Sequence, residues 1–191
     1  MENKLEVIDN IVSAWTGHKE FAMWLIETMQ PDTVVELGVD YGYSTFCFAA
    51  LNIGTIYGID WFNGDSQTGY RNTYSNVMDN IQRGNFNNVK IIADKFDDVA
   101  KKWDKPIDIL HIDGFHMYEY VKNDFENWYP LVRDGGIILM HDTISFPDEV
   151  GKFFDEINLP KLNFKNSAGL GIVSTNTDLM DKIFNNFKHL L

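Results

Sequence analysis

The sequence predicts an α/β fold: a doubly wound, mostly parallel sheet with helices on both faces and an antiparallel hairpin at one edge. Five short apolar runs alternate with amphipathic segments of helical period between residues 18 and 157, and this alternation is typical of parallel sheets. Two further apolar runs, at 161–164 and 169–174, follow each other with little chain between them. That short connection favours antiparallel pairing at an edge.

The length and composition favour one domain. A chain of 191 residues, 45% of them hydrophobic, is long and apolar enough to bury a full core. We therefore expect a single domain over residues 1–191. Within it we expect a helical lead-in at 1–30, an α/β core at 31–175 and a C-terminal helix at 176–191.

Each element is predicted from its periodicity and from the residues that bound it. The first helix runs from His18 to about Met29 and carries an aromatic face that includes Phe21 and Trp24. Strands are expected at 34–37, 55–60, 89–93, 107–113, 135–141, 161–164 and 169–174. The remaining helices are expected at 45–51, 72–83, 96–103, 118–129, 147–157 and 178–189. Residues 61–71 have no periodicity and are expected to form a loop.

The glycine turn after the first strand is the feature around which we expect the site to form. The chain turns through Gly38 and Gly42, and Ser44 is placed to cap the next helix. Such a turn presents backbone N–H groups and a positive helix end to a ligand. The Glu36 carboxylate at the end of an apolar strand needs a donor, and a ligand ammonium or hydroxyl pair would supply one. An ordinary turn with a solvated glutamate is the alternative.

The charge and cysteine content exclude several classes of function. The formal net charge of −12 argues against nucleic acid or an anionic membrane as the main partner. The one cysteine, Cys47, permits no intrachain disulfide or thiolate metal cluster, so it is expected in the core of a cytoplasmic protein. No run approaches the roughly 20 apolar residues that span a membrane.

Acidic side chains end all five of the alternating strands. The carboxyl ends of parallel strands share one edge of the sheet, which is where ligands bind in such folds. Acids gathered there repel one another unless a polyhydroxyl, cationic or metal ligand lies among them. The residues concerned are Glu36, Asp60, Asp94, Asp113 and the pair His141-Asp142.

Three groups of motifs point to a known family. They are Glu36-x-Gly38…Gly42-x-Ser44, Gly58-Ile59-Asp60 with Gly64-Asp65, and Asp113-Gly114-Phe115-His116-x-Tyr118 followed by His141-Asp142-Thr143. Together they resemble the Rossmann-like class I S-adenosylmethionine-dependent methyltransferases. Within that class the chain is similar to small enzymes with an aspartate–glycine–x–histidine block, often linked to glycan or natural-product pathways. The resemblance covers nearly the whole chain, and residues 110–143 are its most specific part.

The resemblance implies a set of cofactor contacts. Glu36 and Gly38 would hold the methionine end of S-adenosylmethionine, and Asp60 would accept both ribose hydroxyls. Asp94 would hold the adenine amino group, and Phe96 would pack on the ring. The other cofactor-binding residues expected are Trp61 and Asp113.

The chain departs from the family pattern in two loops, the glycine turn and the loop after Asp60. Asp40 stands between the two glycines, where a small residue is common. Gln67 stands where the family usually has a histidine, and Asp60-Trp61-Phe62 replaces an aspartate–threonine–tryptophan run. Because the second loop borders the substrate, the acceptor is expected to differ from the family's usual one.

The acceptor side offers groups for proton transfer. His116, assisted by Asp113 and His141, is the predicted catalytic base; a helix cap is the alternative role for His116. A second mechanism places Mg²⁺ or Mn²⁺ on Asp113, Asp142 and His141, although a histidine in place of an acid weakens the magnesium case. His111, inside an apolar strand, is expected to be a core residue.

We therefore expect an S-adenosylmethionine-dependent methyltransferase. Aromatic and polar residues at 61–71 suit a sugar face, so the expected reaction is O-methylation of a sugar-containing or other small molecule, with a larger glycan as another acceptor. The aromatic N-terminal helix is a candidate homodimer interface. The alternatives are a non-catalytic cofactor-binding module and a nicotinamide-dependent oxidoreductase, which would favour G-x-G-x-x-G over the spacing here.

Overall fold

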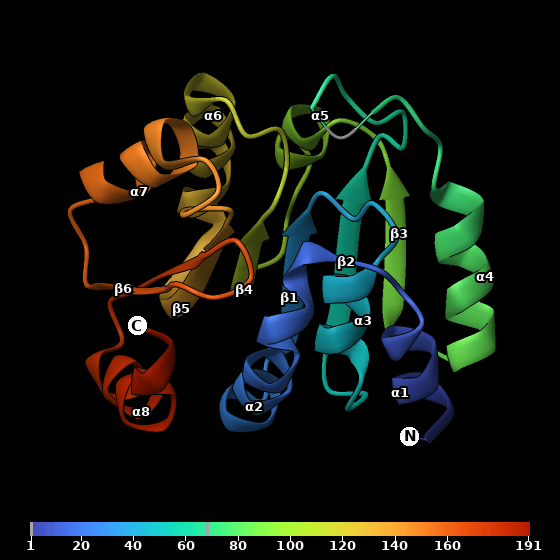
Figure 1. Ribbon diagram of the computed structural model, residues 1–191, viewed down its shortest axis with the longest axis horizontal. Helices are drawn as coiled ribbons and strands as arrows, with labels where there is room; N and C mark the ends of the chain where they lie inside the picture. The colour runs from blue at the N-terminus through green and yellow to red at the C-terminus, as the bar shows by residue number, and fades with distance from the viewer. Residues whose placement is uncertain (1, 68) are drawn as a thin grey trace.

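The computed structural model describes residues 2–67 and 69–191 and shows a seven-stranded sheet in the order β3-β2-β1-β4-β5-β7-β6 (Figure 1). The first five strands in sequence pair in parallel, while β7 pairs antiparallel with both β5 and β6. The strands are β1 (Thr33–Leu37), β2 (Thr55–Asp60), β3 (Val89–Ala93), β4 (Ile107–Ile112), β5 (Val132–His141), β6 (Lys161–Phe164) and β7 (Leu170–Ser174). The predicted fold class and its antiparallel edge are confirmed.

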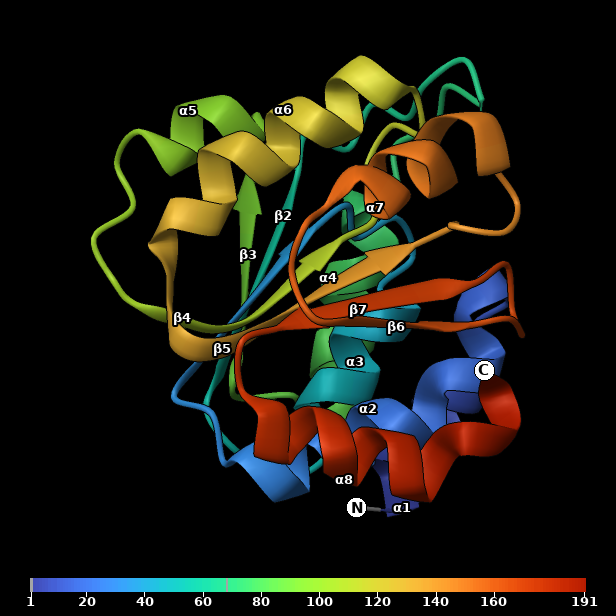
Figure 2. The ribbon, with the colours of Figure 1, turned by 90° about the vertical axis from the view of Figure 1, so that its left-hand side faces the viewer.

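Helices cover both faces of this sheet, as Figure 2 shows. One apolar core joins the sheet to α1 (Glu2–Asp9), α2 (Lys19–Met29), α3 (Tyr43–Ala49), α4 (Tyr74–Gly84) and α8 (Thr177–Phe187). A second core on the other face involves α5 (Phe96–Ala100), α6 (Tyr118–Trp128) and α7 (Lys152–Glu156). Short 3-10 turns lie at Ala14–His18, Tyr129–Leu131 and Lys188–Leu190, and a π-helical turn at Pro147–Gly151.

Two local predictions were wrong. Ser44 does not cap α3, because the helix begins at Tyr43, two residues before the predicted start, after Gly42 in the left-handed region (φ 86°). The single helix expected at 147–157 is instead a π-helical turn followed by the five-residue α7.

The aromatic face of α2 is used inside the molecule. The rings of Phe21 and Trp24 lie 5.3 and 5.2 Å from that of Phe187 in α8, edge to face. This packing removes the reason for placing a homodimer interface there, and a homodimer stays a prediction. Among the helices of residues 2–67 and 69–191, none combines the length and the apolar character needed to cross a membrane.

Candidate active site

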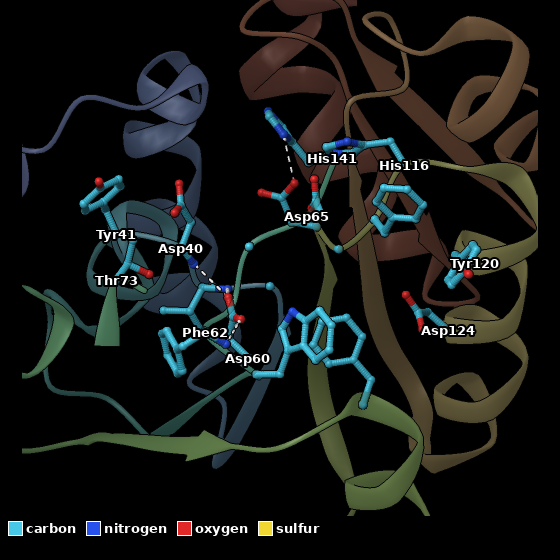
Figure 3. Close-up of a pocket in the computed structure, with 18 of the residues that line it drawn as sticks. Asp40, Tyr41, Asp60, Phe62, Asp65, Thr73, His116, Tyr120, Asp124 and His141 are labelled. Carbon is cyan, nitrogen blue, oxygen red and sulfur yellow. Dashed lines mark hydrogen bonds and ion pairs between the residues drawn. The ribbon is translucent and has the colours of Figure 1, made fainter. Parts of the chain in front are cut away.

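A cavity of about 1050 Å³ opens at the carboxyl edge of the sheet, among the loops that follow β1 to β5. Residues 11–14 also line it. Figure 3 shows Asp40 and Tyr41 on one flank, Tyr120 and Asp124 on the opposite flank, and Asp60 between them. Most of the predicted site residues line this cavity: Gly38, Asp60, Trp61, Asp94, Phe96, Asp113, His116, His141 and Asp142.

Gly38 lets the β1 loop lie directly against the end of β4. Its φ is +94°, and a Cβ built there would lie 2.0 Å from the carbonyl oxygen of Asp113. Any larger residue would push the two loops apart, because the obstacle is backbone. The glycine therefore holds two cavity-lining segments at close range.

Asp60 fixes the loops on either side of the cavity floor. Its Oδ2 accepts backbone N–H bonds from Val39 and Asp40, at 2.9 and 3.0 Å, and its Oδ1 accepts one from Phe62 at 2.7 Å. The carboxylate is only partly buried and lines the cavity. The three backbone bonds use both lone pairs of Oδ2 and one of Oδ1, which leaves one acceptor site on Oδ1 for a ligand hydroxyl. The predicted ribose contact therefore falls to Oδ1.

Glu36 lies beneath the cavity, not on its surface. The side chain is fully buried, and its oxygens accept bonds from the hydroxyls of Ser44 and Thr45. His111 Nδ1 lies 2.9 Å from Glu36 Oε1. The prediction that a ligand supplies the donors for this carboxylate is therefore corrected: the protein supplies all three. Because the Glu36 side chain is fully buried and does not line the cavity, the structure does not support the predicted direct contact with the cofactor.

The Trp15 indole N–H completes this buried group by donating to His111 Nε2 at 3.1 Å. Because Nε2 accepts, the proton of His111 is on Nδ1 and is donated to Glu36. His111 is fully buried, as expected of a core residue. The network ties the segment before α2 to β1 and β4 directly under the glycine loop.

His116 lies at the cavity wall between two acceptors. Its Nε2 is 2.8 Å from Asp142 Oδ2 and its Nδ1 is 3.0 Å from Gln67 Oε1. The same Gln67 oxygen accepts the backbone N–H of His116 at 3.1 Å, which fixes the orientation of the amide. Burial alone would lower the pKa of His116, but the hydrogen bond and charge of Asp142 outweigh burial and raise it. Both ring nitrogens therefore carry protons in this arrangement.

His141 extends the same chain of charges. Its Nδ1 lies 3.3 Å from Asp113 Oδ1 and 3.2 Å from Asp142 Oδ2, and its Nε2 lies 2.9 Å from the Ser167 carbonyl oxygen. Burial opposes the charged ring, yet the two carboxylates raise the pKa of His141 to about 10. Two imidazolium rings and two carboxylates thus alternate along one wall of the cavity.

His18 approaches the same carbonyl from the other side, with its Nε2 3.2 Å from the Ser167 oxygen. The ring is fully buried and is not among the cavity-lining residues. His18 is the N-cap residue of α2, but its side chain makes no capping hydrogen bond. Burial, reinforced by the charge of His141, lowers the pKa of His18 to about 4. The Ser167 hydroxyl accepts the backbone N–H of Gly17 at 2.9 Å, which holds the two segments together.

The acidic cluster also has the donor set of a metal centre. One ligand atom each from Asp113, His141 and Asp142 lies within 4.8 Å of the others. The bond from His141 Nε2 to Ser167 is the outer contact that orients a metal-ligating imidazole. Two carboxylates and an imidazole suit Mn²⁺ better than Mg²⁺, which prefers oxygen ligands alone. These residues fit a divalent ion, and its presence stays a prediction.

The sequence interpretation assigned no role to two cavity-lining side chains, Arg71 and Asp124, and did not predict the contact of Gln67 with His116. Arg71 pairs with Asp40 through Nη2–Oδ2 and Nε–Oδ1 contacts of 2.7 and 3.2 Å, joining the loops after β1 and β2 across the cavity rim. Gln67 holds His116, as described above. Asp124 on α6 is only 6% exposed and lines the cavity. Asp40 and Gln67 are the two departures from the family pattern, so the signal for both was present in the sequence.

This strand order, with a glycine loop after β1 and an acid ending β2, is that of the class I S-adenosylmethionine-dependent methyltransferases. Residues 35–143 match a family described as Methyltransferase domain. The chain therefore belongs to this methyltransferase family.

Similar proteins include the uncharacterized protein y4gI of Sinorhizobium fredii, which is 37% identical over 175 residues. That match covers 84% of this chain and 19% of the relative, so the chain spans about a fifth of the relative's length. Similar solved structures include an O-methyltransferase from Bacillus cereus in complex with SAH, at 18% identity and a TM-score of 0.66, covering 91% of this chain and 89% of that one. The O-methyltransferase TomG from Streptomyces achromogenes, in complex with SAM, has 15% identity and a TM-score of 0.64, covering 86% and 82%.

Proposed function

We propose that this protein transfers a methyl group from S-adenosylmethionine to a hydroxyl oxygen of a sugar-containing or other small molecule. The observation that carries the proposal is that one cavity joins a cofactor-type loop, around Gly38 and Asp60, to a proton-handling cluster around His116 and Asp142. The similar O-methyltransferases from Bacillus cereus and Streptomyces achromogenes support the same chemistry.

The cofactor side of the cavity fits S-adenosylmethionine. Gly38 keeps the loop free of a side chain, Asp60 offers the remaining lone pair of Oδ1 to a ribose hydroxyl, and Phe96 and Trp61 offer ring faces. The bound cofactor supplies an electrophilic methyl group on a sulfonium. The role of the protein is then to align an acceptor oxygen with that methyl group and to exclude misaligned ones.

The acceptor hydroxyl must lose its proton as its oxygen bonds to the methyl group, and His116 is the proposed proton acceptor. In the conformation described, both His116 nitrogens donate, so the ring accepts a proton only in the fraction of molecules in which it is neutral. Because Asp142 raises the pKa of His116, this fraction grows as the pH rises above the ordinary histidine range. Methyl transfer is therefore expected to decline as the pH falls through the raised pKa.

A divalent ion is the second candidate for activating the hydroxyl. The donor set of Asp113, His141 and Asp142 favours it, and a bound ion would lower the pKa of a coordinated hydroxyl. Preincubation with EDTA separates the two mechanisms. Loss of turnover that Mn²⁺ or Mg²⁺ restores, with S-adenosylhomocysteine binding kept, identifies the ion. Full turnover in EDTA leaves proton removal to His116.

The exposed aromatic residues at the cavity favour a sugar-containing acceptor. Tyr70 and Tyr120 line the cavity and are 80% and 56% exposed. Exposed rings provide platforms for the apolar faces of sugars, and the carboxylates between them accept hydroxyl hydrogen bonds. The net charge of −12 makes nucleic acid and anionic membranes poor partners.

Calorimetry with the purified protein tests the proposal. S-Adenosylhomocysteine should bind at micromolar concentrations, and NAD should not. Binding of NAD instead would establish the oxidoreductase alternative, and absence of both would refute the methyltransferase proposal. A screen of glycans, glycosides and sugar nucleotides with methyl-labelled cofactor then identifies the acceptor, while cofactor binding without turnover on any hydroxyl compound would indicate a non-catalytic module.

A further inference from the structure

Asp124 is a buried acid in the cavity to which the proposed mechanism gives no role. Its side chain comes from α6 and is 6% exposed, and Figure 3 shows its carboxyl group directed toward the cavity. Within residues 2–67 and 69–191 it forms no ion pair, and its one hydrogen-bonding neighbour is the adjacent Asn123. A carboxyl group is rarely buried to this extent without a partner.

The surroundings of Asp124 define which part of a ligand it meets. A Cβ built on Gly114 would lie 3.3 Å from Asp124 Oδ2 and 2.7 Å from the Phe96 ring. One part of the cavity is therefore bounded by the Asp124 carboxyl, the Phe96 ring and the backbone of Gly114, which has no side chain. An aromatic ring beside a buried hydrogen-bonding group is suited to a flat heterocycle with a polar edge.

Burial keeps a proton on part of the Asp124 carboxyl groups near neutral pH, so this group can both donate and accept hydrogen bonds. Burial first, and then the negative charge of Asp97, raises the pKa of Asp124 to about 7. The Oδ1 atom of Asp97 is held by the neutral amides of Asn123 and Asn127, at 2.9 and 3.2 Å, which leave its negative charge in place. Ionised or neutral, the Asp124 carboxyl retains an oxygen that accepts a hydrogen bond.

We propose that Asp124 accepts a hydrogen bond from the exocyclic amine of the cofactor's adenine and so selects for that base. The inference rests on the proposed function, since it requires S-adenosylmethionine in this cavity. It moves the recognition of the amine from Asp94, to which the family resemblance assigns it. Asp94 is exposed, and its Oδ1 already accepts the backbone N–H of Lys95 at 2.8 Å.

Asp124 is buried and Asp94 is exposed, which explains why Asp124 is the residue that discriminates between bases. An exposed acceptor that loses its ligand donor is satisfied again by water at little cost. A buried acceptor left without its donor loses that bond in a dry environment, which weakens binding by about tenfold or more. Discrimination between bases therefore comes from the buried acid.

The test compares two ligands that differ only at this amine: S-adenosylhomocysteine and its analogue with hydrogen in place of the 6-amino group. Wild-type protein should bind S-adenosylhomocysteine about tenfold more tightly than the analogue, as measured by Kd. Asp124→Ala and Asp124→Leu, which remove the acceptor, should reduce that preference to about twofold or less. Asp124→Asn keeps an acceptor oxygen in the same shape and should retain most of it.

Asp94→Ala is the matched control and should keep the wild-type preference. Loss of the preference in Asp94→Ala, or its survival in Asp124→Leu, would overturn the assignment to Asp124. Wild-type protein that binds neither ligand would refute the proposed function itself. Wild-type protein that binds both ligands equally would overturn only the role of Asp124.

Discussion

Replacing Asp142 by asparagine should lower the pKa of His116 by about one unit. The two side chains are 12% exposed each, and His116 Nε2 lies 2.8 Å from Asp142 Oδ2. A hydrogen bond to a charged partner contributes about 1.5–3 kcal/mol and a neutral one about 0.5–1.5 kcal/mol. The difference, about 1–1.5 kcal/mol, corresponds to about one pKa unit at 1.36 kcal/mol per unit.

The measurement is a pH titration of the histidine ring nitrogens by long-range ¹H–¹⁵N NMR, in the presence of EDTA and without any acceptor. The His116 signal is assigned by its absence in His116→Gln. Gln67→Ala serves as the control, because it removes a neutral acceptor from Nδ1 and should move the pKa less than Asp142→Asn does. An unchanged His116 titration in Asp142→Asn would refute the reasoning that this carboxylate holds the charge on the ring.

Three further perturbations test other parts of the structure. Asp60→Asn should weaken S-adenosylhomocysteine binding by about 2 kcal/mol, or about thirtyfold, by calorimetry, and unchanged affinity would remove Asp60 from the ribose site. Asp124→Asn should raise the unfolding free energy by about 1–3 kcal/mol at pH 8 but not at pH 4 in urea melts. The sign follows because the folded-state pKa is raised to about 7: between pH 4 and 7 the carboxyl ionises in the unfolded chain while the folded chain keeps it protonated, so stability falls as the pH rises. An equal gain at both pH values would contradict this reasoning. His111→Phe should cost about 3–5 kcal/mol in the same melts by leaving Glu36 and the Trp15 N–H without their buried partner, and a loss below 1 kcal/mol would show that the network contributes little.

The strand ends were predictable because apolar runs and the acids that close them are local features of the chain. Asp60, Asp113 and Asp142 lie at the cavity as the sequence indicated. Parallel strands bring their carboxyl ends to one edge, so the alternation of elements was sufficient to gather these residues. The assignment of Gly38 to a close backbone approach followed from the same argument.

Glu36 and Asp124 required information that periodicity does not contain. The sequence showed that Glu36 needed donors, but their identity depends on the register in which β1 pairs with β4, where Glu36 is opposite His111. Likewise, Asp124 looks like an ordinary polar position of an amphipathic helix. Its burial results from the way α6 lies over the β4 loop near Gly114. Both cases depend on long-range contacts, which a pattern along the chain cannot specify.

The contacts of Ser167 set an order for assembly of the site. They join Ser167 to Gly17 and His18 across 150 and 149 positions of sequence, and to His141 across 26. During synthesis the glycine loop after β1 can fold against β4 long before residue 167 leaves the ribosome. The cluster of Asp113, His141 and Asp142 cannot complete its hydrogen bonds at that stage. Ser167, whose carbonyl oxygen accepts the proton of His141 Nε2, has not yet been synthesised. The cofactor end of the cavity is thus available to a growing chain earlier than the acceptor end, and contacts of such long sequence separation are among the slowest to form.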